Sequence, residues 1–228
     1  YKLDSLTGQW DYIEPALFGY ASAKVIESFT SFYHEHHNIV AQFHEWMTGT
    51  GILYLEHKVP WIATAFTSHA TVLGRCIAGN NRPLYGNIKN YVPGQIAREF
   101  NVVAKQSLEK LSASEADVFT TVSELTSKEC SHFLGKDVDI VTPNGFEDSF
   151  VPGEDLFAGK RDTARLRLKS VAEAILGYKL SDDPVFVANS GRYEFRNKGV
   201  DIFIDSLGQL NKKDNLKKEC VADRKSVV

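Results

Sequence analysis

The stretch Pro184-Val185-Phe186-Val187-Ala188-Asn189 is an apolar run of strand length, and Gly191-Arg192-Tyr193-Glu194-Phe195-Arg196-Asn197-Lys198-Gly199 leads from it into the helical pattern Val200 to Leu210. A strand, a turn with two glycines and a helix make one β/α unit. Amides exposed at a helix start and its positive dipole end favour an anion, while Arg192 can bind it bidentately and Lys198 adds a compact charge. We therefore predict a nucleotide-type diphosphate site in this turn, with Gly191 among its binding residues.

The rest of the sequence alternates apolar runs of strand length with helical patterns. The runs are 39–43, 61–66, 118–122, 140–142 and 185–188, and the helical patterns lie near 17–36, 46–57, 95–115, 123–134 and 163–177. Such alternation is typical of an α/β fold with a parallel sheet and helices on both faces. Ligands of these sheets bind beyond the carboxyl ends of the strands. The candidate site residues should therefore meet at that edge.

Turn residues divide the chain into segments. Thr142-Pro143-Asn144-Gly145 ends a strand, and the stretch from there to about residue 162 is rich in Pro, Gly and mixed charges, so we expect a linker. Asp182-Asp183-Pro184 opens the last β/α unit, which ends near Leu210. Residues 211–228 carry six basic and three acidic side chains and show no strand signal, so we expect an irregular, solvated tail.

Composition limits the function classes. The chain has 228 residues, 26 of them Lys or Arg and 29 Asp or Glu, and its formal net charge of −3 gives no overall field for nucleic acid or an anionic membrane. The first residues do not resemble a signal peptide, and no apolar run approaches the roughly 20 residues of a membrane span. Three cysteines without a CxxC spacing indicate a reducing compartment, by default the cytoplasm. The missing initiating methionine indicates that the start is absent.

Two predicted strand ends carry side chains suited to catalysis. His69 and Arg75 follow the run 61–66 within Phe66-Thr67-Ser68-His69-Ala70-Thr71-Val72-Leu73-Gly74-Arg75. A neutral imidazole there can hydrogen-bond a sugar hydroxyl or a developing charge, and Arg75 can neutralise phosphate. His44 and Glu45 follow the run 39–43, so they lie at the same sheet edge and are candidates to line the cleft. A purely structural role for either histidine stays open.

The same residues allow alternatives. Arg192 and Lys198 can instead form surface ion pairs with Glu194 or Asp201, which contribute roughly 0–1 kcal/mol. Four histidines lie close together in the sequence and could suggest a zinc site: His34, His36, His37 and His44. Their spacing lacks the i, i+4 pair of an HExxH helix, so we predict that they bind no metal. No GxSxG, P-loop or GxGxxG motif occurs, which leaves hydrolysis by a serine or cysteine nucleophile without support, and we expect no cofactor.

Five strings, in this order and spacing, resemble the animal and fungal type of glycogen synthase: AQFHEW, ATAFTSHATVLGR, DVFTTVSELT, DIVTPNG and GRYEFRNKG. The resemblance covers most of residues 10–210. It implies a retaining glycosyltransferase with two Rossmann-like domains that face each other across a cleft, the GT-B architecture. Residues 1–180 would then be the later part of the N-terminal domain with its linker. Residues 181–210 would be the first β/α unit of the C-terminal nucleotide-sugar-binding domain, which is only begun.

The resemblance also implies a reaction, the transfer of glucose from UDP-glucose to the 4-hydroxyl of glycogen or another α-1,4-glucan with retention of configuration. By resemblance, His69 lies beside the donor glucose, while Arg192 and Lys198 hold the diphosphate and stabilise its charge as it leaves. Arg75 corresponds to another basic residue of the active site. The further substrate-binding candidates are His44, Glu45, Asn144 and Gly191. Neither nucleic acid nor a membrane is expected as a partner, and whether the full-length enzyme is a homo-oligomer stays open.

The chain also departs from the family pattern. The glycine-rich loop near the amino terminus of the full enzyme is missing, and residues 219–228 look unlike the second strand of a Rossmann domain. The important carboxylates of the family lie in a later segment of the second domain. We therefore expect the isolated chain to be inactive. One alternative is a non-catalytic nucleotide-sugar or glucan-binding relative, and another is a metal hydrolase, which would bind zinc.

Overall fold

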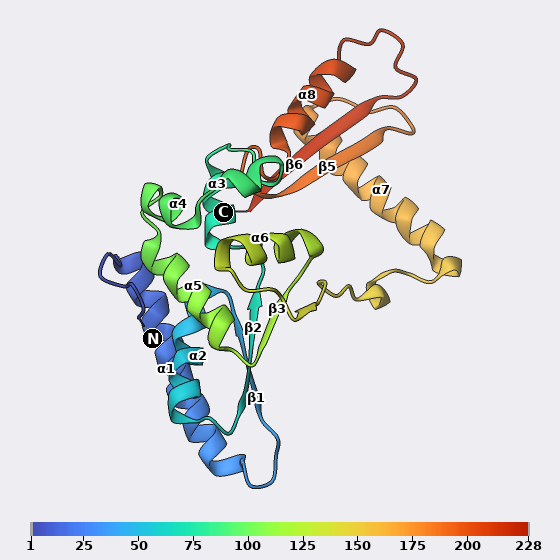
Figure 1. Cartoon of the computed structure of the whole chain (residues 1–228). Helices are drawn as coiled ribbons and strands as arrows, with labels where there is room; N and C mark the ends of the chain where they lie inside the picture. Colours follow the sequence, from blue (N-terminus) through green and yellow to red (C-terminus); the bar gives the residue numbers. More distant parts are fainter. Residues whose placement is uncertain (1, 228) are drawn as a thin grey trace. The chain divides into compact units, whose positions relative to one another are not determined.

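Four parallel strands form the sheet of the first part of the chain. The computed structural model describes residues 2–227, which fall into two units: unit 1 ends at Asn144 and unit 2 begins at Gly145. The strands of unit 1 lie side by side in chain order (Figure 1): β1 (Val40–His44), β2 (Ala63–Ser68), β3 (Val118–Thr121) and β4 (Ile140–Val141). The helices of unit 1 are α1 (Trp10–Tyr33), α2 (Gly49–Lys58), α3 (Val72–Gly79), α4 (Pro93–Glu99), α5 (Val103–Glu115) and α6 (Glu124–Leu134), with short 3-10 helices η1 (Trp46–Thr48) and η2 (Tyr85–Asn90). The predicted α/β class, a parallel sheet flanked by helices, is confirmed.

The core of unit 1 lies on one face of this sheet. Phe43, Phe66 and Phe119 point into it from three neighbouring strands and are at most 4% exposed. They pack against apolar side chains of the connecting helices, among them Ile52, Leu55, Cys130 and Leu134. On the opposite face Val40 is 65% exposed. Because the strand order equals the chain order, each connection between these strands moves one place along the sheet in the same direction, as right-handed β/α crossovers do.

One predicted helix is divided in two. The pattern 95–115 becomes α4 and α5, which are separated at Asn101, whose φ of 55° is left-handed. The amide of Val102 donates to the carbonyl of Ala97 at 2.8 Å, so the chain turns back onto the end of α4. Asparagine tolerates this conformation and ends helices there. The apolar periodicity continues through the break, which is why the sequence pattern did not reveal it.

Unit 2 contains more regular structure than the sequence predicted. Its elements are the 3-10 helix η3 (Asp148–Phe150), α7 (Glu154–Leu176), β5 (Val185–Arg192), α8 (Val200–Leu210) and β6 (Cys220–Val227). The expected linker to residue 162 is wrong from Glu154 onward, because Glu154 and Asp155 in the first turn favour a helix start. The expected irregular tail is also wrong, since β6 pairs in parallel with β5 and so satisfies its backbone groups. The predicted domain boundaries near 180 and 210 stay predictions.

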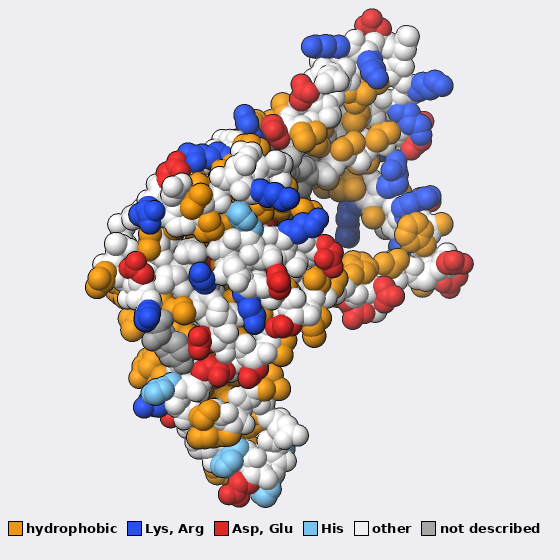
Figure 2. Space-filling model, in the orientation of Figure 1, with side chains coloured by type: hydrophobic (Ala, Val, Ile, Leu, Met, Phe, Trp, Pro, Cys, Tyr) orange, Lys and Arg blue, Asp and Glu red, His pale blue; other side chains and the backbone are white. Residues whose placement is uncertain are grey.

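The surface of unit 1 carries many apolar side chains. Figure 2 shows hydrophobic atoms at the surface over α1, and the most exposed large ones on this helix are Trp10, Leu17, Phe18, Val25, Phe29 and Phe32. Within residues 2–227, no helix combines the length and the apolar character that crossing a bilayer requires.

Candidate functional site

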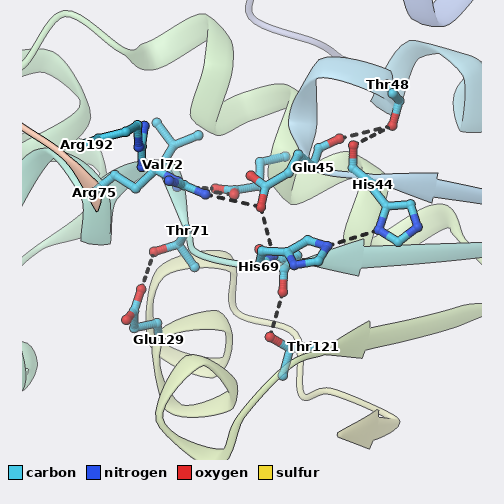
Figure 3. A network of polar contacts seen from close by, with 12 residues as sticks. His44, Glu45, Thr48, His69, Thr71, Val72, Arg75, Thr121, Glu129 and Arg192 are labelled. Carbon is cyan, nitrogen blue, oxygen red and sulfur yellow. Dashed lines mark hydrogen bonds and ion pairs between the residues drawn. The ribbon is translucent and has the colours of Figure 1, made fainter. Parts of the chain in front are cut away.

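Two histidines and a glutamate meet at the carboxyl ends of β1 and β2. His44 is the last residue of β1 and Glu45 follows it, while His69 follows β2, the neighbouring strand. The ring atoms His44 Nδ1 and His69 Nε2 lie 3.0 Å apart, and Glu45 Oε1 accepts a hydrogen bond of 2.9 Å from the His69 amide. Figure 3 shows both contacts. The structure thus brings together three residues that the sequence predicted to share this edge.

Arg75 completes this cluster from α3. Its Nη2 lies 3.4 Å from Glu45 Oε1, and its side chain is half-exposed while that of Glu45 is largely buried (Figure 3). Glu45 has a φ of 63° and a ψ of 161°, a conformation that non-glycine residues rarely adopt and that costs about 1–3 kcal/mol. The amide of Glu45 donates to the Thr67 carbonyl at 2.9 Å, which holds it in place. The carboxylate therefore ties the His69 backbone to a guanidinium.

The segment between His69 and Arg75 is fixed at the start of α3 by Thr71. Thr71 is the N-cap: its hydroxyl accepts from the Gly74 amide at 3.0 Å and donates to Glu129 Oε2 at 2.9 Å. Glu129 comes from α6, is 3% exposed, and its Oε1 accepts from the Tyr85 hydroxyl at 2.7 Å. Burial, together with this bond to a carboxylate, raises the pKa of Tyr85 to about 12. The cap is thus secured by a buried carboxylate from another helix.

A second buried carboxylate reaches the same segment from α5. Glu109 is fully buried, and its Oε1 and Oε2 accept from the Val72 amide at 3.1 and 3.0 Å. Burial raises the pKa of Glu109 to about 8, although the Val72 bond acts in the opposite direction. The charges of Glu45 and Glu129 raise this pKa further, and that of Arg75 lowers it. The Glu109 carboxyl is therefore mostly protonated at neutral pH.

Sequence reasoning missed both of these glutamates. Each occupies a core-facing position of an amphipathic helix: Glu109 lies beside the buried Leu108 and Ser112, and Glu129 beside the buried Cys130 and Phe133. An acidic residue within the apolar stripe of a helix is the signal that could have found them, because carboxylates are almost never fully buried without a partner. The partners themselves lie 37 and 58 positions away in the sequence, so no local pattern identifies them.

The predicted phosphate turn lies in unit 2. β5 extends four residues further than expected and ends at Arg192, so Gly191 and Arg192 belong to the strand rather than to the turn. Arg192 Nη2 pairs with Glu194 Oε1 at 2.9 Å, the surface pairing that the sequence left open. Lys198 is exposed, and a Cβ placed on Gly191 would lie 3.8 Å from its side chain. Lys198 therefore lies beside Gly191, and the side chains of both Arg192 and Lys198 are reachable from solvent.

The amides at the start of α8 differ from the expectation. The sequence predicted that they are free for an anion, but those of Val200 and Asp201 donate to the carbonyl of Phe195 at 2.9 and 3.2 Å. Gly199 takes a φ of 64° just before the helix, which turns the chain so that these bonds form. The donors that remain for an anion at this place include the side chains of Arg192 and Lys198.

The remaining sequence candidates lie elsewhere. Asn144 is exposed, three residues after the end of β4. His34 Nδ1 donates to the Thr30 carbonyl at 2.9 Å and so caps the end of α1. Among residues 2–227, no group of three or more His, Cys, Asp or Glu side chains is arranged to hold a metal ion.

Comparison with known sequences gives the family. Residues 9–228 match the family described as glycogen synthase. The chain belongs to the glycogen synthase family. It is 37% identical over 199 residues to the liver glycogen [starch] synthase of Rattus norvegicus, which covers 86% of this chain and 28% of that protein. It is 34% identical over 210 residues to glycogen [starch] synthase of Dictyostelium discoideum, covering 87% of this chain and 23% of that protein.

The family resemblance inferred from the five sequence strings is thereby confirmed. A third glycogen [starch] synthase, from Caenorhabditis elegans, is 35% identical over 177 residues, 76% of this chain and 26% of that protein. The chain thus spans about a quarter of the length of these curated relatives.

Proposed function

We propose that this chain carries donor-binding residues of a glycogen synthase that transfers glucose from UDP-glucose to the 4-hydroxyl of an α-1,4-glucan, with retention of configuration. The observation that carries the proposal is the cluster of His44, Glu45, His69 and Arg75 at the carboxyl ends of β1 and β2. Parallel α/β sheets bind their ligands at these ends. Membership of the family supports the choice of substrates.

In unit 1, we assign His69 to the donor glucose. Hydrogen bonding to His44 fixes the direction of its ring, and the Glu45 bond fixes its backbone, so its imidazole is preorganised. In the His44–His69 bond one ring nitrogen must donate and the other accept, so the two rings cannot both be fully protonated while it persists. A neutral imidazole next to a sugar can exchange hydrogen bonds with its hydroxyls. Arg75 supplies positive charge beside it.

In unit 2, we assign Arg192 and Lys198 to the donor diphosphate, with Gly191 beside them. As the glycosidic bond breaks, negative charge grows on the departing phosphate, and cations placed there lower the barrier. Arg192 must then exchange Glu194 for a phosphate. An exposed pair of that kind is worth only about 0–1 kcal/mol, whereas a bidentate phosphate contact is stronger, so the exchange favours the ligand.

The finer assignments follow the family. His44, Glu45 and Asn144 are proposed as further substrate-binding residues, and glycogen or a related α-glucan as the acceptor. We also propose that the Rossmann-like domain of unit 1 and the β/α unit around β5 belong to the two domains of a GT-B enzyme. Assembly into a homo-oligomer and residence in the cytoplasm are parts of the same proposal, the latter supported by three unpaired cysteines, Cys76, Cys130 and Cys220.

The test is a calorimetric titration of the 228-residue chain with UDP-glucose. We expect binding in the wild type and a loss of at least tenfold in affinity when Arg192→Ala and Lys198→Ala are combined. The matched control combines Lys212→Ala and Lys213→Ala, which removes two exposed cations of the same unit that follow α8, where Figure 2 shows basic side chains. Equal losses for both double variants would show non-specific attraction and contradict the assignment. Binding of glycogen without UDP-glucose would favour a glucan-binding relative instead.

A further inference from the structure

Three carboxylates from three different elements converge on the seven residues from His69 to Arg75. Glu45, at the end of β1, accepts from the His69 amide. Glu109, from α5, accepts from the Val72 amide with both oxygens. Glu129, from α6, accepts from the Thr71 hydroxyl. Figure 3 shows the bonds of Glu45 and Glu129. Three of the first four residues of the segment, His69, Thr71 and Val72, are therefore each held by a different glutamate.

Two of these glutamates occupy core-facing helix positions, where side chains are usually apolar. Glu109 is fully buried and Glu129 is 3% exposed, and both are flanked by core residues of their helices. Burying a carboxyl group, whether ionised or neutral, is unfavourable unless hydrogen bonds compensate it. The hydrogen bonds of the Glu109 carboxylate within residues 2–227 all come from the Val72 amide, and one of the two partners of Glu129 is Thr71. Both side chains therefore stabilise, through these hydrogen bonds, the conformation of the segment that carries His69 and Arg75.

The close packing around Glu129 limits how the segment can move. A Cβ placed on Gly74 would lie 2.1 Å from Glu129 Oε2, so the backbone of α3 approaches the carboxylate as closely as a glycine allows. Thr71 bonds both partners at once, accepting from the Gly74 amide and donating to Glu129. A shift of the first turn of α3 would break both bonds. Arg75 follows Gly74 in this turn, so the direction of the Arg75 side chain depends on the same contacts.

We infer that Glu109 and Glu129 are positioning residues that hold His69 and Arg75 in place through the backbone of the β2–α3 segment. Neither touches the His44, His69 or Arg75 side chains through a hydrogen bond in the described part of the chain; they act through Val72 and Thr71. The inference rests on the proposed function only where it concerns the donor. The placement of His69 and Arg75 can be measured without any ligand.

The experiment uses the 228-residue chain labelled with 15N and compares Glu109→Met and Glu129→Met with Glu109→Gln and Glu129→Gln. Methionine keeps the bulk but removes the acceptor, whereas the glutamine oxygen can still accept. The controls are Leu108→Ala and Cys130→Ala, the fully buried neighbours of the two glutamates on the same helices. The readouts are amide hydrogen exchange at Val72 and His69, relative to the most protected amides of unit 1, and the 15N shifts of the His69 and His44 rings.

We expect each methionine variant to reduce the relative protection of Val72 or His69 at least tenfold and to move the His69 ring resonances, with substantial recovery in the glutamine variant. The alanine controls should lower all protected amides together and leave these resonances in place. Unchanged His69 resonances in both methionine variants, or equal changes in the controls, would overturn the inference. If the local changes appear but wild type does not bind UDP-glucose, the proposed function fails while the positioning role stands.

Discussion

Gly74→Ala is the substitution whose effect can be worked out most completely from the structure. The new methyl carbon would lie 2.1 Å from Glu129 Oε2, 2.8 Å from Thr71 Oγ1 and 3.0 Å from Glu129 Cδ. Because contacts under 3.0 Å do not persist, either the carboxylate or the first turn of α3 must move. Glu129 is anchored by Thr71 and Tyr85, so it cannot rotate away without losing at least one charge-assisted hydrogen bond.

The expected change in the free energy of unfolding combines two costs with one smaller gain. Forcing an extra carbon into a packed site costs about 1–3 kcal/mol, and one lost hydrogen bond to a buried carboxylate costs about 1.5–3 kcal/mol. Alanine gains about 0.5–1 kcal/mol over glycine within a helix. We therefore expect Gly74→Ala to lower the free energy of unfolding of unit 1 by about 2–4 kcal/mol. The matched control is Gly79→Ala at the end of the same helix, where no atom lies within 4 Å of the new carbon, and it should not destabilise.

Urea unfolding followed by tryptophan fluorescence measures these values, because all three tryptophans, Trp10, Trp46 and Trp61, lie in unit 1. A double-mutant cycle identifies the cause. In a Glu129→Ala background the clashing carboxylate is gone, so Gly74→Ala should cost less there, while the cost of its 2.8 Å contact with Thr71 Oγ1 remains. If Gly74→Ala is as stable as the wild type, or if it costs the same with and without Glu129, the account of this packing is refuted.

Three further predictions concern the same unit. The pKa of Glu109 in the folded chain, about 8, lies above its ordinary value of 4.5, so the contribution of this group to stability is present in acid and is lost as the pH rises toward 8. Between pH 5 and pH 8, Glu109→Gln should therefore gain stability relative to the wild type, by about 1.4 kcal/mol for each unit of pKa difference that titrates. Urea unfolding curves of the two proteins that do not separate as the pH rises would contradict this. Ser123 accepts from the Thr126 amide at 3.1 Å as the N-cap of α6, and Ser123→Ala should destabilise by about 1 kcal/mol, with exposed Ser114→Ala as the neutral comparison in thermal melts. Gly135 has a φ of 68° and open space around it, so Gly135→Ala should cost about 1 kcal/mol through the backbone alone, while Gly135→Asn should recover part of this in the same melts.

The sequence predicted the parts of the fold that depend on local pattern. The strand ends that carry His44 and His69 were predictable because apolar runs, turns and helical periods alternate, and parallel strands bring their carboxyl ends to one edge. The break at Asn101 and the strand β6 were not, since both depend on backbone bonds formed after folding. The break interrupts no apolar pattern, and β6 forms because β5 offers an unpaired edge.

The candidate site, too, could be predicted from the sequence only in part. The positions of His44, Glu45 and His69 after apolar runs predicted that they share one sheet edge, and Glu45 contacts both His69 and Arg75. The supports behind them were hidden, because Glu109 and Glu129 act on Val72 and Thr71 across 37 and 58 positions of sequence. Whether the amides at the start of α8 are free to bind an anion could not be predicted either, since their bonds to the Phe195 carbonyl depend on the left-handed conformation of Gly199.

We propose above all that the strand-end cluster around His69 contacts the glucose of the donor. The most direct measurement compares titrations of the 15N-labelled chain with UDP-glucose and with UDP, observing the His44 and His69 rings. The account predicts that UDP-glucose moves the His69 ring resonances in a saturable way and that UDP alone, which lacks the sugar, leaves them unchanged. Equal shifts with both nucleotides, or none with either at saturation, would contradict the assignment of this cluster to the donor sugar.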